Sequence, residues 1–485
     1  MRVQATLALL LAAGCSTYTA VNPPLTHAPN LATGYRWATT TIPRKSNSTL
    51  IILAFSGGGT RAAGLSYGVL QQLDATPMPG GGKLIDGVDI ISSVSGGSFA
   101  SMDYALRGPQ MLADFPKTFL QVPMQTMLFK SAYLNPKNLV RLLFDPNFHR
   151  INVAVELYDD VIFHHATFKE LLAAQQASNR PFVIANSTEL EIGAQFQWTQ
   201  DFFDPICSDL QPIRVAAAVA ASSNFPVLLP PTILSTYDAS ACGYKPPSWM
   251  PNARSDAYLN PIRARYAAEL SSYLAPQRKF LHLLDGGIAD NIGLRGPYQA
   301  LISSDTYVQS QDDGSGQQRT GFTLNPLLNA ASGARAIDRV LVVIVNAGTE
   351  GTVKIDTRSK EPTLPTILSG ISTTPMANYS FDTVQQLLNL LNQRQKNTGA
   401  RAYPVNIAFS LLPDETESDK ELRNTVNNIG TSFSALSDAQ LAALQKAANV
   451  LIHQDPCFQQ FIRDINGTPF PDGAPVCVSA LPPTP

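Results

Sequence analysis

The sequence predicts an α/β fold in which helices cover a mainly parallel central sheet. Short apolar runs alternate with amphipathic segments along the chain, and glycine-rich turns follow several of these runs. Hydrophobic residues make up 44% of the 485 residues, and charged residues make up 15%. Such a chain can bury a large core, and its composition excludes collagen, a coiled coil and a wholly disordered protein.

The first apolar runs show the alternation of strand, turn and helix. Leu50 to Phe55 is a buried-strand candidate, and after a glycine turn Arg61 to Leu73 carries apolar residues at helical spacing. The same order recurs in Val88 to Val94 and Phe99 to Leu106. Three more short apolar runs predict buried strands, at Phe182 to Ala185, Phe280 to Leu284 and Val340 to Val345. Buried strands separated by helices favour a parallel sheet.

Two helices and one further strand are predicted beyond Asn346. An apolar stripe marks the first helix, formed by Val384, Leu387, Leu388 and Leu391. Ser437 and Gln440 form a capping box for the second helix, which is expected to end near His453. Ile407 to Leu411 is the strand candidate between them. The chain shows no internal repeat, which disfavours solenoids and propellers.

The charge balance argues against nucleic acid as a partner. The chain has 35 Lys and Arg residues against 37 Asp and Glu residues, for a formal net charge of −2. It therefore lacks the basic field that would neutralise phosphates along a nucleic acid. The sequence does not set an oligomeric state.

The N-terminus has the layout of an export signal. Arg2 precedes an apolar stretch from Val3 to Ala13, and small residues lead to Cys15. The tetrapeptide Ala12-Ala13-Gly14-Cys15 resembles a bacterial lipobox, which implies a signal peptide over residues 1–14 and lipidation of Cys15. An ordinary secretory signal that is cut nearby is the alternative. Both interpretations predict an exported protein of the cell envelope, and the lipobox predicts a membrane-anchored lipoprotein on the outer-membrane or periplasmic side.

The rest of the chain divides into three predicted parts. Residues 15–48 are rich in Thr, Pro, Asn and Ala without periodicity, so we expect a flexible tether. Residues 49–350 are predicted to form the main domain, in which residues 101–170 are a mostly helical insertion. Residues 351–485 are expected to form a helical extension that packs on this domain.

Four cysteines remain after Cys15, and their even number in an exported chain is compatible with two disulfides. They are Cys207, Cys242, Cys457 and Cys477. Proximity in sequence suggests that Cys207 pairs with Cys242 and Cys457 with Cys477, although four cysteines allow three pairings. Buried free thiols are the alternative. No CxxC motif or His/Cys cluster indicates a metal site.

Two glycine-rich motifs follow predicted strands. The run SGGGTR at residues 56–61 lets the backbone approach a ligand closely, and the helix that follows presents free amides, so this turn can hold an oxyanion or a phosphate. The run Asp285-Gly286-Gly287 places a carboxylate at the end of a strand, where α/β proteins build sites. Taken alone, each motif also fits a plain structural turn.

A serine-containing turn lies between them. Residues 93–97, Ser-Val-Ser-Gly-Gly, approximate the GxSxG nucleophile elbow, in which a serine sits on a strained turn between a strand and a helix. Ser95 is the nucleophile candidate in this pattern. Because Ser93 replaces the usual first glycine, Ser92, Ser93 and Ser98 remain formal rivals.

Taken jointly and in this order, the motifs resemble those of the patatin-like phospholipases. The resemblance covers about residues 50–345 and is carried by SGGGTR (56–61), SVSGGS (93–98) and DGGIADN (285–291). Two further stretches look like bacterial members of the family: ANSTELEIGAQF (185–196) and VAAAVAASSNFPVLLPP (215–231). The main domain would then be a patatin-like three-layer α/β/α sandwich with a mainly parallel central sheet and helical additions.

The resemblance implies a serine acyl hydrolase that cleaves fatty-acyl esters of phospholipids or other lipids through an acyl-enzyme. Ser95 would be the nucleophile and Asp285 its general base. The oxyanion hole would be built from the backbone amides of Gly57, Gly58 and Gly59, with Arg61 supporting that loop. A serine–aspartate dyad needs no metal and no organic cofactor. The expected partner is a membrane phospholipid or another lipid ester.

A Ser-His-Asp triad is the competing arrangement. Only His453 follows Asp285 in the chain, as the hydrolase order requires, and it fits the end of a predicted helix better. His164 and His165 occur in the wrong order, and His282 lies in a predicted strand. Two alternative functions stay open: an acyltransferase or general carboxylesterase with the same dyad, and a non-catalytic envelope lipoprotein that binds lipid or a partner.

Overall fold

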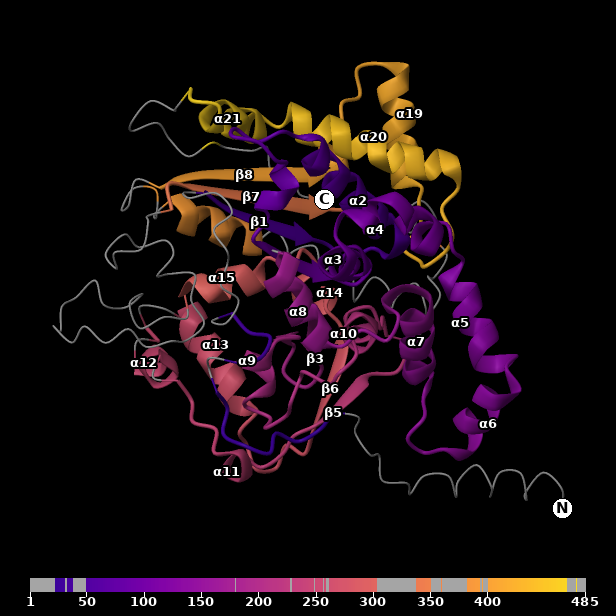
Figure 1. Ribbon diagram of the computed structural model, residues 1–485, viewed down its shortest axis with the longest axis vertical. Helices are drawn as coiled ribbons and strands as arrows, with labels where there is room; N and C mark the ends of the chain where they lie inside the picture. The colour runs from indigo at the N-terminus through magenta and orange to yellow at the C-terminus, as the bar shows by residue number, and fades with distance from the viewer. Residues whose placement is uncertain are drawn as a thin grey trace.

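The structure is a computed structural model, shown in Figure 1. It describes residues 22–30, 33–37, 49–178, 180–226, 229–247, 249–255, 257–258, 261–302, 337–349, 359, 382–392, 395, 400–468 and 477. The predicted signal peptide and Cys15 lie outside the described residues, as does the greater part of the predicted tether.

An eight-stranded sheet organises the described chain (Figure 1). Its strands are β1 (Thr49–Phe55), β2 (Ile90–Val94), β3 (Phe182–Glu189), β4 (Ala194–Gln197), β5 (Thr232–Ser235), β6 (Phe280–Asp285), β7 (Arg339–Asn346) and β8 (Arg401–Ala408). The strand order is β5-β6-β3-β2-β1-β7-β8, and β4 pairs with β3 off this path. The strands β3, β2, β1, β7 and β8 are parallel, whereas β4, β5 and β6 are paired in antiparallel fashion. The predicted α/β class with a mainly parallel sheet is confirmed.

Helices cover the sheet and form the additions to it. They are α2 (Gly59–Ala75), α3 (Gly96–Arg107), α4 (Pro109–Phe115), α5 (Met124–Tyr133), α6 (Pro136–Phe144), α7 (Arg150–Tyr158), α8 (Phe168–Ser178), α9 (Gln200–Phe203), α10 (Val215–Ser222), α11 (Ala239–Cys242), α12 (Trp249–Ser255), α13 (Pro261–Ser272), α14 (Gly287–Asp290), α15 (Arg295–Ile302), α19 (Glu417–Asn427), α20 (Asp438–Gln454) and α21 (Pro456–Ile465). Short 3₁₀ or π segments lie at Leu84–Gly87, Pro116–Leu120, Asp159–Phe163 and Phe409–Leu411. In Figure 1, α20 and α21 lie on one side of β7 and β8, and the helical residues 382–392 lie on the other.

The central strands β1 and β2 and the first half of β3 are continuous runs of apolar and small residues because they are buried. Every residue of β1, β2 and β3 is buried. A strand that is covered on both faces cannot show an alternation of apolar and polar residues. This is why short apolar runs, and not a period of two, located these strands in the sequence.

One strand lies earlier than predicted. The sequence favours a strand over Ile407–Leu411, whereas β8 covers Arg401–Ala408 and is followed by a 3₁₀ turn. Pro404 lies inside β8. Proline is tolerated there because β8 is the last strand in the sheet order and, among the described strands, pairs with β7 alone.

Part of the predicted tether is packed against the fold. Tyr35 and Trp37 are buried, and their rings lie 4.8 and 5.0 Å from that of Phe182. Arg36 between them is buried as well, and its Nη1 lies 2.7 Å from a carboxylate oxygen of Asp204. The expectation of a flexible tether is therefore wrong for these residues. A single buried turn has no periodicity, so the sequence pattern did not indicate it.

The C-terminal helices are joined to the sheet and to α2. Asp464 on α21 is buried and accepts hydrogen bonds from Arg339 of β7 at 3.1 Å and Arg401 of β8 at 2.9 Å. Helix α20 crosses α2 so closely that a Cβ on Gly64 would lie 2.7 Å from Leu444. The predicted capping box of α20 is confirmed, since Ser437 and Gln440 exchange side-chain and backbone hydrogen bonds.

Two disulfides are present, Cys207–Cys242 and Cys457–Cys477, with Cα atoms 5.7 and 5.4 Å apart. The pairing that sequence proximity suggests is confirmed. The first bond joins α11 to the turn after α9, and the second joins the start of α21 to Cys477. No helix among the described residues is long and apolar enough to cross a bilayer.

We predict that loss of the Cys207–Cys242 disulfide lowers the free energy of unfolding by about 2–4 kcal/mol, because cross-linked residues that are 35 positions apart restrict the unfolded chain. The double variant Cys207→Ser, Cys242→Ser and the wild type should be compared by urea unfolding. In reductant the two proteins should be equally stable. A variant as stable as the oxidised wild type would show that this bond contributes nothing.

Candidate active site

Ser95 occupies a strained turn between β2 and α3. Its φ is +49°, a left-handed conformation that residues other than glycine rarely adopt. The side chain is buried, and the Ser95 amide donates a hydrogen bond of 2.9 Å to Ser222 Oγ. Ser222 in turn donates to the Asn186 carbonyl at 2.6 Å. The backbone of the turn is thus held by a fixed chain of hydrogen bonds.

The serine turn touches the glycine loop through backbone atoms. A Cβ on Gly96 would lie 2.0 Å from the carbonyl oxygen of Gly59, and a Cβ on Gly57 would lie 3.3 Å from Ser95 Cβ. Only a residue without a side chain lets the start of α3 approach the loop this closely. The two motifs, which are well separated in sequence, therefore form one surface.

Asp285 reaches this surface on a strand that runs in the opposite direction. Strand β3 is longer than β2, and Asn186 of β3 is in register with Val94, the last residue of β2. The next residue of β3, Ser187, is in register with Asp285 of the antiparallel β6. Because β3 extends beyond β2, the end of β6 lies beside the serine turn.

The Asp285 carboxyl is buried beside the Ser95 side chain. Burial raises its pKa to about 6, while a hydrogen bond of 2.8 Å from the Gly287 amide and the nearby Ser95 hydroxyl hold the pKa down in part. At neutral pH the carboxylate is therefore largely ionised, and it is a stronger base than an exposed aspartate. The structure thus brings together the predicted nucleophile and the predicted base.

The glycine loop differs from the sequence-based expectation at one position. The Gly57 amide donates to the carbonyl of Asn291 at 3.0 Å, so it is already engaged and does not fit the predicted oxyanion role. Within the described chain, the amides of Gly58 and Gly59 have no hydrogen-bond partner. Their φ angles of +137° and +62° lie in the region that favours glycine.

Arg61 supports the loop from behind. Its buried guanidinium donates to the carbonyl of Ala347 at 2.9 Å, to the carbonyl of Ile429 and to Thr431 Oγ1 at 3.0 Å. Burial lowers the pKa of Arg61 to about 10, so the group still carries its charge at neutral pH. Arg61 thus connects the start of α2 to two distant segments.

The rival serines lie in a buried hydrogen-bond network. Ser93 Oγ donates to Ser98 Oγ at 3.2 Å, and the hydroxyls of Ser98 and Ser222 are 3.0 Å apart. Ser92 Oγ accepts a hydrogen bond of 2.9 Å from the Asn186 side chain. All three rivals are fully buried. Of these serines only Ser95 affects the pKa of Asp285, which leaves Ser95 as the candidate nucleophile.

Four residues that hold the site have no role in the sequence-based prediction: Asn186, Thr188, Ser222 and Asn224. Thr188 Oγ1 donates to the Asp285 carbonyl at 2.8 Å, and the Asn224 side chain donates to the carbonyl of Leu283 at 2.9 Å. All four lie in the two softer stretches, residues 185–196 and 215–231. Ser222 and Asn224 are polar residues in a largely apolar stretch, which was the available signal for them, whereas Asn186 and Thr188 stand in a stretch rich in polar residues.

The remaining polar candidates have structural roles. Asp290 is buried and accepts a hydrogen bond of 2.6 Å from the Arg295 amide at the start of α15. His453 lies at the exposed end of α20, 3.3 Å from Gln72 Oε1, and His165 bonds to Asp159 at 2.6 Å. No group of His, Cys, Asp or Glu side chains suited to a metal occurs among the described residues.

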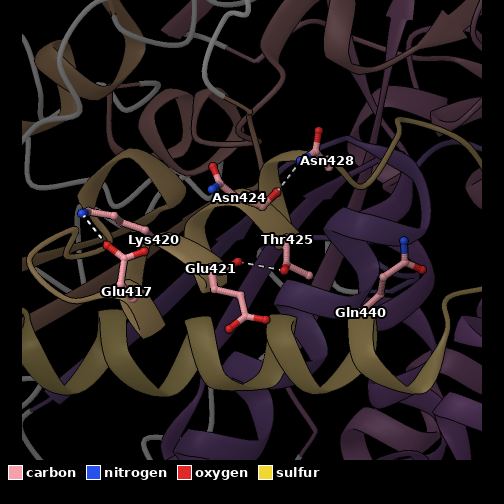
Figure 2. Close-up of a pocket in the computed structure, with 7 residues that line it drawn as sticks. All are labelled: Glu417, Lys420, Glu421, Asn424, Thr425, Asn428 and Gln440. Atoms are coloured by element: carbon pink, nitrogen blue, oxygen red, sulfur yellow. Dashed lines mark hydrogen bonds and ion pairs between the residues drawn. The ribbon is translucent and has the colours of Figure 1, made fainter.

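A separate pocket lies between α19 and α20 (Figure 2). Its lining is polar: Glu417, Lys420, Glu421, Asn424, Thr425, Asn428 and Gln440. Several of these side chains bond to one another or to their own helix, as Lys420 does to Glu417 at 2.9 Å. Neither Ser95 nor Asp285 lines this pocket, so it is not the candidate site.

Comparison with known proteins gives one family match and distant structural similarities. No curated protein sequence matches the chain. Human GIVD cytosolic phospholipase A2 is 9% identical with a TM-score of 0.45, and the match covers 90% of this chain but only 65% of that one. VipD from Legionella pneumophila is 11% identical with a TM-score of 0.30, and the match covers 95% and 73% of the two chains.

The family match is the informative one. The model of the patatin-like phospholipases matches residues 53–298, about half of the 485 residues. This range contains the glycine loop, the serine turn and Asp285. The chain therefore belongs to the patatin-like phospholipase family.

Proposed function

We propose that this protein hydrolyses fatty-acyl esters of phospholipids or related lipids with a dyad of Ser95 and Asp285. Membership of the patatin-like phospholipase family implies a lipid acyl hydrolase. The observation that carries the finer proposal is that the Ser95 side chain lies close enough to the buried carboxylate of Asp285 to lower its pKa, beside the unengaged amides of Gly58 and Gly59. Nucleophile, base and oxyanion donors are the parts that acyl transfer requires.

The first half of the reaction acylates Ser95. Ser95 Oγ attacks the ester carbonyl carbon while Asp285 accepts the hydroxyl proton. The negative charge that develops on the carbonyl oxygen is stabilised by the amides of Gly58 and Gly59 and by the positive end of the α2 dipole. The tetrahedral intermediate then collapses, the carbon–oxygen bond to the alcohol breaks, and the leaving alkoxide takes the proton from Asp285. A lysolipid or an alcohol departs.

The second half regenerates the enzyme. Asp285 accepts a proton from a water molecule as its oxygen attacks the acyl carbon on Ser95. Collapse of the second intermediate releases the fatty acid, and Ser95 Oγ recovers its proton from Asp285. Transfer to an alcohol would use the same residues with another acceptor. Nothing in the described part of the chain favours such an acceptor, so water completes the proposed cycle.

The proposed location is outside the cytoplasm, in the cell envelope. Two disulfides support an oxidising compartment, and the export signal predicted from residues 1–14 is consistent with it. Lipidation of Cys15 remains part of this proposal. An acyl anchor would hold the enzyme at the bilayer that contains its substrate.

We predict that Ser95→Ala abolishes fatty-acid release from phospholipid vesicles and removes labelling by a fluorophosphonate. Asp285→Asn should lower kcat about 10²- to 10⁴-fold, the range expected for loss of a general base. Ser66→Ala, a buried serine of α2 without a bonded hydroxyl partner in the described chain, serves as the matched control and should retain activity. Activity that survives in Ser95→Ala would refute the dyad.

The raised pKa of Asp285 predicts the pH dependence. Asp285 acts as a base only when it is ionised, so kcat/KM should rise about tenfold per pH unit up to about 6 and then level off. Initial rates with a soluble ester across pH 4 to 9 measure this. A rate that is flat from pH 4 to 7 contradicts the assignment.

Stability gives an independent check of the same pKa. The pKa of Asp285 is higher in the folded protein than in the unfolded chain. Its contribution to the free energy of unfolding is therefore fully present below about pH 4 and is lost as the pH rises through about 6. Asp285→Asn escapes this loss and should be more stable than the wild type at pH 8, by on the order of 2–3 kcal/mol. The difference in stability between Asp285→Asn and the wild type, measured by thermal or urea unfolding, should disappear as the pH is lowered to about 4.

We predict that Gly58→Ala lowers kcat about 10- to 100-fold, because alanine is strained at a φ of +137° and the loop must shift its amides. Gly193→Ala is the matched control, since Gly193 has a φ of +66° with nothing within 4 Å of its Cβ position, in the turn between β3 and β4. Equal losses in both variants would mean that backbone strain alone, and not the oxyanion loop, explains the effect.

A further inference from the structure

The hairpin of α5 and α6 presents an apolar face to solvent. Five of its large apolar side chains are more than half exposed: Phe129 (57%), Leu134 (67%), Val140 (54%), Leu143 (65%) and Phe144 (78%). On α6 the pairs 139/143 and 140/144 are four residues apart, so they lie on one side of the helix. Most large exposed apolar side chains of the described chain lie in this hairpin. In Figure 1 the hairpin forms one edge of the molecule.

The opposite face of α6 is occupied by polar contacts with the protein. Arg141 Nη1 lies 2.9 Å from the Glu156 carboxylate of α7, and its guanidinium stacks 3.5 Å from the centre of the Phe148 ring. Asn138 is buried and donates to the carbonyl of Ser131 on α5 at 3.1 Å. The inner side of α6 thus carries Asn138 and Arg141 beside Leu142, whereas most of its large apolar side chains lie on the outer side.

The hairpin does not depend on its exposed side chains for packing. A small core of its own, formed by Ala132, Phe148 and Val153 with Leu128 and Leu142 against it, joins α5 and α6 to α7. The exposed apolar residues are not part of this core. They cost solubility without stabilising the fold, which indicates a surface that is covered in use.

Positive charge borders the apolar face. Lys130 and Lys137 lie in the hairpin, and the only acid in residues 124–149 is Asp145; Arg141 is paired with Glu156. Lys130 and Lys137 are exposed. Apolar side chains beside exposed lysines match the boundary between the acyl chains and the anionic headgroups of a phospholipid surface.

The hairpin is connected to α3, the helix that follows Ser95. Phe99 of α3 stacks on Phe119 at 4.3 Å, and both rings contact Phe433. The Gln125 amide at the start of α5 donates to the carbonyl of Phe433 at 3.0 Å. A surface that holds the hairpin would therefore hold the active-site helix close to it.

We propose that the α5–α6 hairpin is an interfacial membrane-docking element that inserts its apolar face into an anionic phospholipid surface. The helices span ten and nine residues, too short to cross a bilayer and long enough to lie in its interface. Lys130 and Lys137 bind lipid phosphates at the rim. The inference deepens the proposed function and rests on it for the choice of a lipid surface over a protein partner.

Vesicle binding tests the proposal in the full chain. Every protein carries Cys15→Ser, so that no acyl chain is attached, and Ser95→Ala, so that the vesicles stay intact. Co-sedimentation is measured with vesicles of phosphatidylcholine alone and of equal parts phosphatidylcholine and phosphatidylglycerol. The apolar variant is Leu143→Ser, Phe144→Ser, and the charge variant is Lys130→Gln, Lys137→Gln. Leu190→Ser, Tyr258→Ser is the matched control, because both side chains are exposed outside the hairpin.

We expect the apolar variant to bind mixed vesicles at least tenfold more weakly than the control, since two inserted side chains return to water. The charge variant should lose about tenfold on mixed vesicles and little on phosphatidylcholine alone. The thermal unfolding midpoints of both variants should be nearly the same as that of the control. Addition of vesicles should also slow amide hydrogen exchange in the peptides of α6, which is measured without any hairpin substitution.

Two outcomes would overturn the proposal. One is equal vesicle binding by the apolar variant and the control, with no protection of α6. The other is concentration-dependent self-association in sedimentation velocity that the apolar variant abolishes while vesicle binding is unaffected, since the face would then be covered by a second copy. Hydrolysis of a soluble ester by the chain with Ser95 intact tests the proposed function separately. Vesicle binding without ester hydrolysis would refute the proposed hydrolase function and leave the docking proposal standing.

Discussion

The direct backbone contact between the glycine loop and the serine turn is the constraint on which the site depends. Strands β1 and β2 are adjacent and parallel, so the turns that follow them meet at the same edge of the sheet. The carbonyl oxygen of Gly59 occupies the space that a Cβ on Gly96 would need. Because no side chain separates the two turns, the distance from Ser95 to the loop amides is set by the sheet itself, and the geometry is pre-organised before a substrate binds.

A segment far outside the family match completes this loop. Both the amide and the hydroxyl of Thr60 donate to the carbonyl of Ser432, at 2.9 and 3.0 Å, and Arg61 reaches the neighbouring Ile429 and Thr431. These contacts bridge about 370 positions in the chain. The connection between α19 and α20 therefore belongs to the architecture of the candidate active site, although the recognisable family region, residues 53–298, ends long before it.

Burial of Asp285 shows how stability and reactivity oppose each other here. A low-dielectric environment disfavours the carboxylate, and the same effect strengthens it as a base for a serine hydroxyl. The hydrogen bond from the Gly287 amide limits the rise in pKa, so that the group stays ionised at neutral pH. Ser95 adds a second strained element through its positive φ. The fully buried strands β1, β2 and β3 provide the rigid frame that tolerates both.

The sequence alone determined the strand–turn–helix units and the three motifs, because these depend on local spacing and on glycine. It suggested the pairing of cysteines near in sequence but left the other pairings open. Only the tertiary structure decided how Asp285 reaches Ser95, since the greater length of β3 brings an antiparallel strand to the site. It also decided that Asn291 engages the Gly57 amide, that Tyr35 is buried, and that α6 turns its apolar face outward. Each of these outcomes depends on which distant surface an element meets, and a local pattern of residue types carries no information about that partner.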